Sequence, residues 1–189
     1  MKSAEKSVRL AEILRQLADR APQDFEEFCN MFLNLSYADF DDCYGLSDIS
    51  VKTEECLAVP VFRGPYIAEV LLWGPDAYTP VFDFRKFKFR IMVLQGAITK
   101  VRYRKNETYL DYDGVDSWFC GQRFQVNGNF VQSLLNNFYG RSVTLNLYDT
   151  SEFNLSDIRV FDTLQRKVFQ LRGGSFSCPW YQPDALTAT

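Results

Sequence analysis

From about residue 50 onward, the chain alternates apolar and polar residues over short runs, and this alternation restricts the fold more than any other feature. A period of two residues is typical of β-strands with one buried face. Glycine, proline and the pair Asn127-Gly128 separate the runs, as expected for β-hairpins. We therefore predict an antiparallel sandwich or barrel of short strands over residues 50–175. The runs that we interpret as strands are Ile67–Trp73, Phe89–Gln95, Ile98–Arg104, Glu107–Asp111, Gln122–Val126, Val143–Tyr148, Ile158–Thr163 and Lys167–Leu171.

Residues 1–45 follow a different period. Apolar residues recur at steps of three and four between residues 8 and 18, which predicts an amphipathic helix. Ala21-Pro22 ends this helix, because proline disfavours a helical conformation at the preceding residue. Asp24 followed by Glu27 is a capping-box pattern and predicts the start of a second helix. We expect a packed helical hairpin in this N-terminal part.

The chain has 189 residues, a length typical of a single domain. We expect residues 176–189, after the last predicted strand, to form a loose tail. Five cysteines without CxxC spacing indicate reduced thiols rather than a disulfide framework or a metal site. The charged N-terminus lacks the apolar core of a signal peptide, and no run is apolar enough to span a bilayer. We therefore expect a cytoplasmic protein without membrane contact.

The sequence contains no histidine. This excludes Ser-His-Asp and Cys-His catalytic units, zinc sites with a histidine ligand, and the iron site made of two histidines and a carboxylate. It also removes the usual general base near neutral pH. Other side chains can perform acid–base chemistry, but no motif in the chain indicates such an enzyme.

Two basic stretches, Phe82–Arg90 and Lys100–Lys105, interleave cations with aromatic or aliphatic residues. Such a pattern can form a stacking platform for single-stranded nucleic acid. The net charge of -3 argues against nucleic acid, so we interpret both stretches as strands with solvated cations. Both stretches can gather on one face, which makes an anionic partner worth testing.

An acidic segment follows, with Asp111, Asp113 and Asp116 around Gly114. It has a faint similarity to a calcium loop, but Gln122 stands where that loop needs a bidentate glutamate. We interpret the segment as a solvated hairpin loop. The apolar residues after it, 118–121, either cover the barrel mouth or form a subunit contact.

Three short motifs carry a resemblance to a known family. They are Leu71-Leu72-Trp73-Gly74, Val81-Phe82-Asp83-Phe84 and Leu94-Gln95-Gly96. Together they resemble the cysteine dioxygenase family of cupins, in which an apolar strand ending in Trp-Gly, a His-x-His segment and a strand ending in Leu-Gln-Gly follow one another. The resemblance implies a mostly β protein, a small cupin jelly-roll β-barrel with N-terminal helices.

In that family, three histidines hold a mononuclear non-haem iron that oxidises a thiol to a sulfinate. The resemblance places the first two ligands at Phe82 and Phe84, and the third on or near Ser133. It places the other groups of the family site as follows: a further histidine at Asn146, the cross-linking cysteine at Phe89, the tyrosine at Tyr148 and the substrate-binding arginine near Cys56.

These replacements remove the chemistry of an iron site. Phenylalanine has no lone pair for a metal, so Phe82 and Phe84 cannot be ligands, and Ser133 alone would be a weak one. Residues two apart in a strand share a face, so both phenylalanines should point into the barrel and Asp83 away from it. We therefore expect no iron and no other cofactor, although the resemblance implies iron.

The aromatic rings allow two arrangements inside the barrel. We expect Phe82, Phe84 and Phe89 to fill the former iron cavity, because aromatic residues on strands mostly pack. Alternatively, they line an apolar pocket whose few polar groups come from the other three positions. Those three are Ser133, Asn146 and Tyr148.

Three functional hypotheses follow. The first is a catalytically inactive, metal-free cupin that binds a small molecule or a protein partner. The second is a relative of thiol dioxygenases with a non-standard metal site, which requires carboxylates that converge in the barrel. The third is a scaffold subunit that pairs with an active cupin. The sequence leaves the ligand, the partner and the oligomeric state open.

Overall fold

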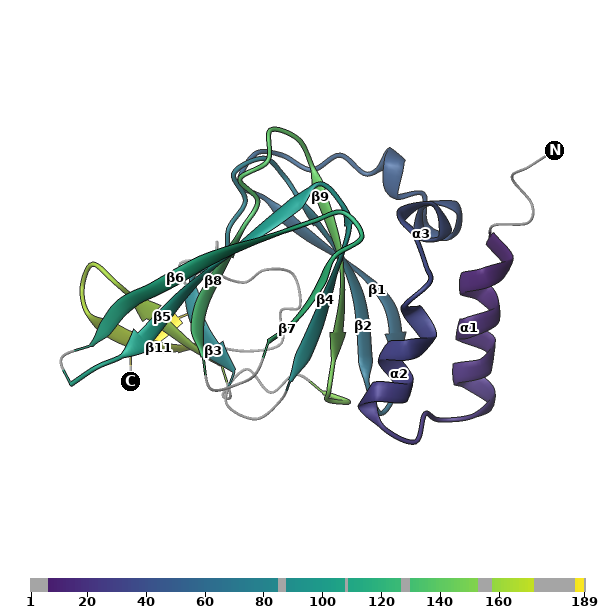
Figure 1. Ribbon diagram of the computed structural model, residues 1–189, viewed down its shortest axis with the longest axis horizontal. Coiled ribbons are helices and arrows are strands. Elements are labelled where there is room, and N and C mark those ends of the chain that lie inside the picture. The colour runs from purple at the N-terminus through teal and green to yellow at the C-terminus, as the bar shows by residue number, and fades with distance from the viewer. Residues whose placement is uncertain are drawn as a thin grey trace.

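The computed structural model describes residues 7–84, 88–107, 109–126, 130–152, 158–171 and 186–188. Two β-sheets face each other across a shared core, and three helices cover the outside of one sheet (Figure 1). The helices are α1 (Ser7–Asp19), α2 (Phe25–Phe32) and α3 (Tyr37–Tyr44), followed by the 3-10 turn η1 (Leu46–Asp48). The strands are β1 (Cys56–Arg63), β2 (Ile67–Trp73), β3 (Val81–Phe84), β4 (Phe89–Gln95), β5 (Ala97–Lys105), β6 (Leu110–Phe119), β7 (Arg123–Val126), β8 (Val131–Leu135), β9 (Ser142–Tyr148), β10 (Ile158–Asp162), β11 (Lys167–Leu171) and β12 (Leu186–Ala188).

The two sheets are antiparallel and have jelly-roll connectivity. One has the strand order β1-β2-β9-β4-β7, and the other has the order β12-β11-β10-β3-β8-β5-β6. Strands that are distant in the chain lie side by side, as β9 does between β2 and β4. This confirms the predicted barrel of short strands, and β2 and β4 begin and end at the predicted residues.

The central strands β2 and β9 of the five-stranded sheet are buried on both faces, because neither has an exposed residue. Ile67, Leu71 and Trp73 point into the barrel core. Val70 and Leu72, on the other face of β2, pack with the helices. Two-sided burial explains why β2 reads as an almost continuous apolar run.

The N-terminal part has one helix more than the predicted hairpin, namely α3. The backbone N–H of Ser36 donates a hydrogen bond to Asp39 Oδ2 over 2.7 Å, and together the two residues form a capping box. Gly45 ends the helix in the left-handed conformation, with φ 60°. Both signals are present in the sequence, but the helix is only eight residues long and its apolar periodicity is poor.

The predicted strand over 107–111 is confirmed only at Leu110 and Asp111, and the predicted loop after it is wrong, because β6 continues through the acidic segment. Its acids face the cations of β5, and Asp113 Oδ1 lies 2.6 Å from Arg104 Nη2. Arg102 forms ion pairs with both Asp113 and Asp116. A bulge at Gly114 shifts the register between β5 and β6. These charged side chains stay partly exposed, and their ion pairs join the two strands.

The C-terminal segment is not a tail throughout. Residues 186–188 form β12, which pairs with β11 through Leu171 and Leu186. The rest of the predicted tail lies outside the described residues, and so does the predicted turn at Asn127-Gly128. Within the described residues, no helix combines the length and the apolarity needed to cross a membrane.

The contact between helices and sheet should contribute strongly to stability. Phe28 of α2 is fully buried, and its ring packs against Phe32, Phe62 and Tyr66 with centroids 5.2–5.7 Å apart. Phe28→Ala should lower the free energy of unfolding by about 3–5 kcal/mol in urea denaturation, because it leaves a cavity. The control Val8→Ala, at a side chain 59% exposed, should cost less than about 0.5 kcal/mol. Equal losses would contradict this packing.

Candidate functional site

Three of the predicted site residues lie in one core inside the barrel. Phe82 of β3 is 2% exposed and belongs to the same buried cluster as Phe89 of β4 and Tyr148 of β9. Phe89 and Tyr148 are direct partners across the two strands, and their rings stack with centroids 5.5 Å apart. Phe84 belongs to β3, but its side chain lies outside the described part of the chain.

A row of hydrogen bonds connects buried polar groups on the barrel face of the five-stranded sheet. Trp73 Nε1 donates to Thr144 Oγ1 over 3.0 Å, and that hydroxyl donates to Asn146 Oδ1 over 2.8 Å. Asn146 Nδ2 then donates to Tyr148 Oη over 3.2 Å. The structure thus brings Asn146 and Tyr148 together, but both ends of the Asn146 amide are engaged within the protein.

Ser133 does not join this group. Leu134 of β8 points into the barrel core, so Ser133 next to it points to the other side of the strand. Ser133 Oγ donates to the backbone oxygen of Thr79 over 2.7 Å. Gln132 is the residue of β8 that stands directly opposite Phe82. A shift of one residue in the position matched to the third ligand therefore moves that position from one face of β8 to the other.

Glu69 is a buried carboxylate that the sequence analysis missed. It lies on the barrel face of β2, directly opposite Asn146, and is 3% exposed. Arg63 Nη2 of β1 lies 3.0 Å from Glu69 Oε1. Burial raises the pKa of Glu69, and the charge of Arg63 opposes this rise. A single acid within an otherwise apolar strand was the available signal.

Cys56, near which the resemblance placed an arginine, is buried at the end of β1 opposite to Arg63.

Asp83 points away from Phe82, as strand alternation requires, but it is not solvated. It is 1% exposed and forms ion pairs with Lys105, at 2.8 Å, and with Arg159. Lys105 itself keeps 44% of its side chain exposed, so an ion pair to a buried carboxylate and contact with solvent coexist at this residue. In the other basic stretch, residues 85–87 lie outside the described residues.

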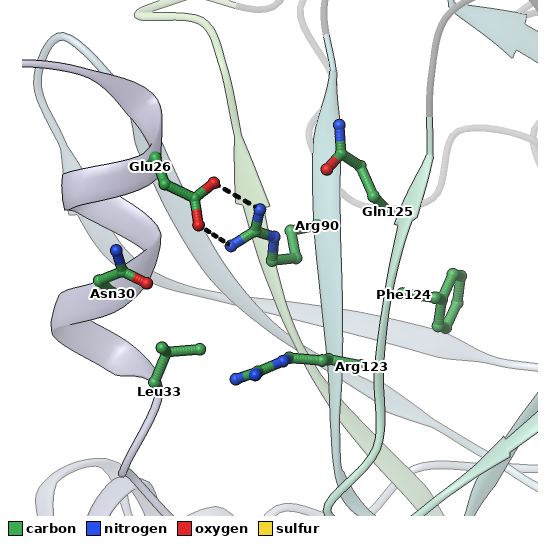
Figure 2. Close-up of a pocket in the computed structure, with 7 residues that line it drawn as sticks. All are labelled: Glu26, Asn30, Leu33, Arg90, Arg123, Phe124 and Gln125. Atoms are coloured by element: carbon green, nitrogen blue, oxygen red, sulfur yellow. Dashed lines mark hydrogen bonds and ion pairs between the residues drawn. The ribbon is translucent and has the colours of Figure 1, made fainter.

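A polar groove of about 290 Å³ lies outside the barrel, between α2 and the strands β4 and β7. Figure 2 shows Arg90 directed at Glu26, with Nη1–Oε1 and Nη2–Oε2 distances of 3.1 and 2.7 Å, while Arg123 extends from β7 towards the helix. This hydrogen-bonded pair lowers the pKa of Glu26 and ties α2 to the sheet. Behind it, burial raises the pKa of the Cys29 thiol to about 12, which leaves no thiolate for nucleophilic chemistry.

Trp118 bridges the two sheets where β6 and β7 form their edges. Its ring stacks on Phe124 of β7, with the centroids 3.9 Å apart. Of the two sequence-based alternatives for residues 118–121, this contact favours a cover over the barrel. Phe119, next to it, remains 59% exposed.

No protein-family model and no curated protein matches this sequence. Solved structures with a similar fold include a cupin-superfamily sugar phosphate isomerase from Silicibacter pomeroyi, with a TM-score of 0.50 and 10% identity over 76% of this chain and 89% of that one. The cupin domain of Cnp3 from Schizosaccharomyces pombe has a TM-score of 0.45 and 16% identity over 64% and 74%. A cupin-superfamily protein from Desulfitobacterium hafniense has a TM-score of 0.42 and 11% identity over 53% and 83%.

The fold is that of a cupin jelly-roll barrel, which confirms the predicted fold class. Identities near 10% show the shared fold and carry no information about activity.

The buried Glu69 should make stability depend on pH. Because folding raises its pKa, this residue favours folding below the ordinary value of 4.5, and the contribution is lost as the pH rises through the folded value. In urea denaturation, the free energy of unfolding of the native chain should therefore fall between pH 4 and pH 7 relative to that of Glu69→Gln. The control Glu107→Gln, at an exposed residue, should track the native chain. Parallel pH profiles for the native chain and Glu69→Gln would refute this.

Proposed function

We propose that this chain is a cysteine dioxygenase-like cupin that has lost the iron site and acts as a binding or interaction protein. The burial of Phe82 in the barrel core carries the proposal, because the resemblance places an iron ligand there. The absence of histidine from the whole sequence supports it.

The remaining positions of the family site do not fit an iron ion either. Ser133 faces away from the barrel core and is bonded to Thr79. Asn146 stands where the resemblance places a further histidine, and its amide is held by Thr144 and Tyr148. Each of these side chains serves packing or hydrogen bonding, so we derive no oxidation step for this barrel.

A non-standard metal site is the enzymatic alternative. It requires carboxylates or thiolates that converge, and the described residues contain no group of three or more such side chains placed to hold a metal. Glu69 lies inside the barrel and is paired with Arg63. We therefore favour binding over catalysis, and the partner would be a small molecule or a protein, including an active cupin that this chain supports as a scaffold.

The cysteines agree with a reducing compartment, and we propose a cytoplasmic location on this ground. Among the described residues, the thiols of Cys29 and Cys56 are buried, those of Cys43 and Cys120 are exposed, and none of the four forms a disulfide. Exposed free thiols are typical of proteins outside oxidising compartments.

Metal analysis tests the proposal directly. Protein expressed without an affinity tag in iron-supplemented cells should contain no stoichiometric iron, zinc or manganese by mass spectrometry, because the family positions offer no ligand set. It should also consume no oxygen with cysteine or another small thiol. Stoichiometric metal would overturn the proposal. Loss of that metal in Glu69→Gln, but not in Glu107→Gln, would assign it to the barrel interior and favour the enzymatic alternative.

A further inference from the structure

A pocket of about 320 Å³ lies between the two sheets on the side of the Trp118 ring, and none of the named site residues of the sequence analysis lines it. Strands β5 and β8 of the seven-stranded sheet contribute cations and an amide, and β7 of the other sheet contributes apolar surface. The lining residues used in the argument are Lys100, Arg102, Asp113, Val126, Phe130 and Gln132. The volume lies near the lower end of ligand pockets, which span roughly 300–1,000 Å³, so an occupant would be small.

Lys100 supplies a positive charge whose direct neighbour across the strands, Asp116, forms its ion pair with Arg102 instead. Its Nζ lies 4.7 Å from the ring centroid of Trp118 and 5.2 Å from that of Phe124. No acidic side chain among the described residues forms an ion pair with it, although ion pairs hold its neighbours Arg102 and Arg104. Partial burial, with a smaller effect of Arg102, lowers the pKa of Lys100. An anion next to the ammonium would reverse this shift.

Gln132 supplies a buried donor without a partner. The residue is 1% exposed, and its Nε2 makes no hydrogen bond within the described residues. It stands directly opposite Arg102 on one side and Phe82 on the other, so it faces the barrel interior. Buried donors are almost always paired in proteins, and an unpaired one that lines a pocket indicates a missing acceptor.

Arg102 is not available as an anion-binding group, because carboxylates of the protein already neutralise its charge. Asp113 and Asp116 both form ion pairs with it, which holds the guanidinium in the pocket wall. Asp113 also lines the pocket. Asp113 would therefore repel a dianion such as phosphate more strongly than a singly charged carboxylate, which the ammonium of Lys100 and the amide of Gln132 can bind.

We propose that this pocket binds the carboxylate of a small organic acid, with Lys100 and Gln132 as its donors. The apolar part of the ligand lies against Val126 and Phe130. The proposal deepens and rests on the proposed binding function, since it names the class of ligand that the iron-free barrel takes.

Benzoate is a suitable probe, with benzamide as its uncharged counterpart of equal shape. In NMR titrations of the full chain, benzoate should bind saturably and shift the side-chain amide resonances of Gln132. The affinity for benzamide should be lower by about tenfold or more, because benzamide lacks the negative charge that would interact with the Lys100 ammonium. Equal binding of both probes, or no shift at Gln132, overturns the proposal without recourse to any variant.

Two matched variants assign the charge. Lys100→Met should weaken benzoate binding about tenfold or more, whereas the control Lys52→Met, at a side chain 83% exposed, should leave it unchanged. Gln132→Glu should also weaken it by repulsion. Unchanged affinity in Lys100→Met, or tighter binding of phenyl phosphate than of benzoate, contradicts the assignment.

The metal content of the same sample separates the two proposals. Metal-free protein that does not bind benzoate refutes only the carboxylate site, whereas metal-loaded protein refutes the proposed function.

Discussion

The architecture depends on a sheet whose central strands have no access to water. β2 and β9 are buried on both faces, one against the helices and the other inside the barrel. Any polar side chain on these strands therefore needs a partner within the protein. The row from Trp73 through Thr144 and Asn146 to Tyr148 meets this need, and Arg63 meets it for Glu69.

Because of this constraint, the polar groups that stabilise the fold and the groups available to a ligand lie on different sheets. On the five-stranded sheet, hydrogen bonds and packing occupy the polar groups, and Phe82 extends the apolar core from the opposite sheet. The groups with unused capacity, the ammonium of Lys100 and the amide of Gln132, lie on β5 and β8 of the seven-stranded sheet. The barrel interior around Phe82 is thus occupied by a core, and a pocket lies beside it.

Sequence periodicity predicted the strands that are long, apolar and regular. β2 and β4 have the predicted bounds, since their alternation and flanking turns are local properties. Most of β6 was missed because its acidic residues, such as Asp113, suggest a loop in the sequence. They are compatible with a strand because cations of the neighbouring strand β5 form ion pairs with them. Ser133 was assigned to the site because alternation does not decide which of two neighbouring residues faces inward.

The sequence by itself determined the fold class and the absence of histidine-based chemistry, because residue period and residue type are properties of the chain alone. Tertiary structure decided which polar groups face one another. Gln132 and Phe82 meet only through the register of β3 with β8, and Lys100 lies over Trp118 only because β5 pairs with β6. Pairing between distant strands sets the burial and the neighbours of each side chain, and these decide whether a charge or an amide is available for a ligand.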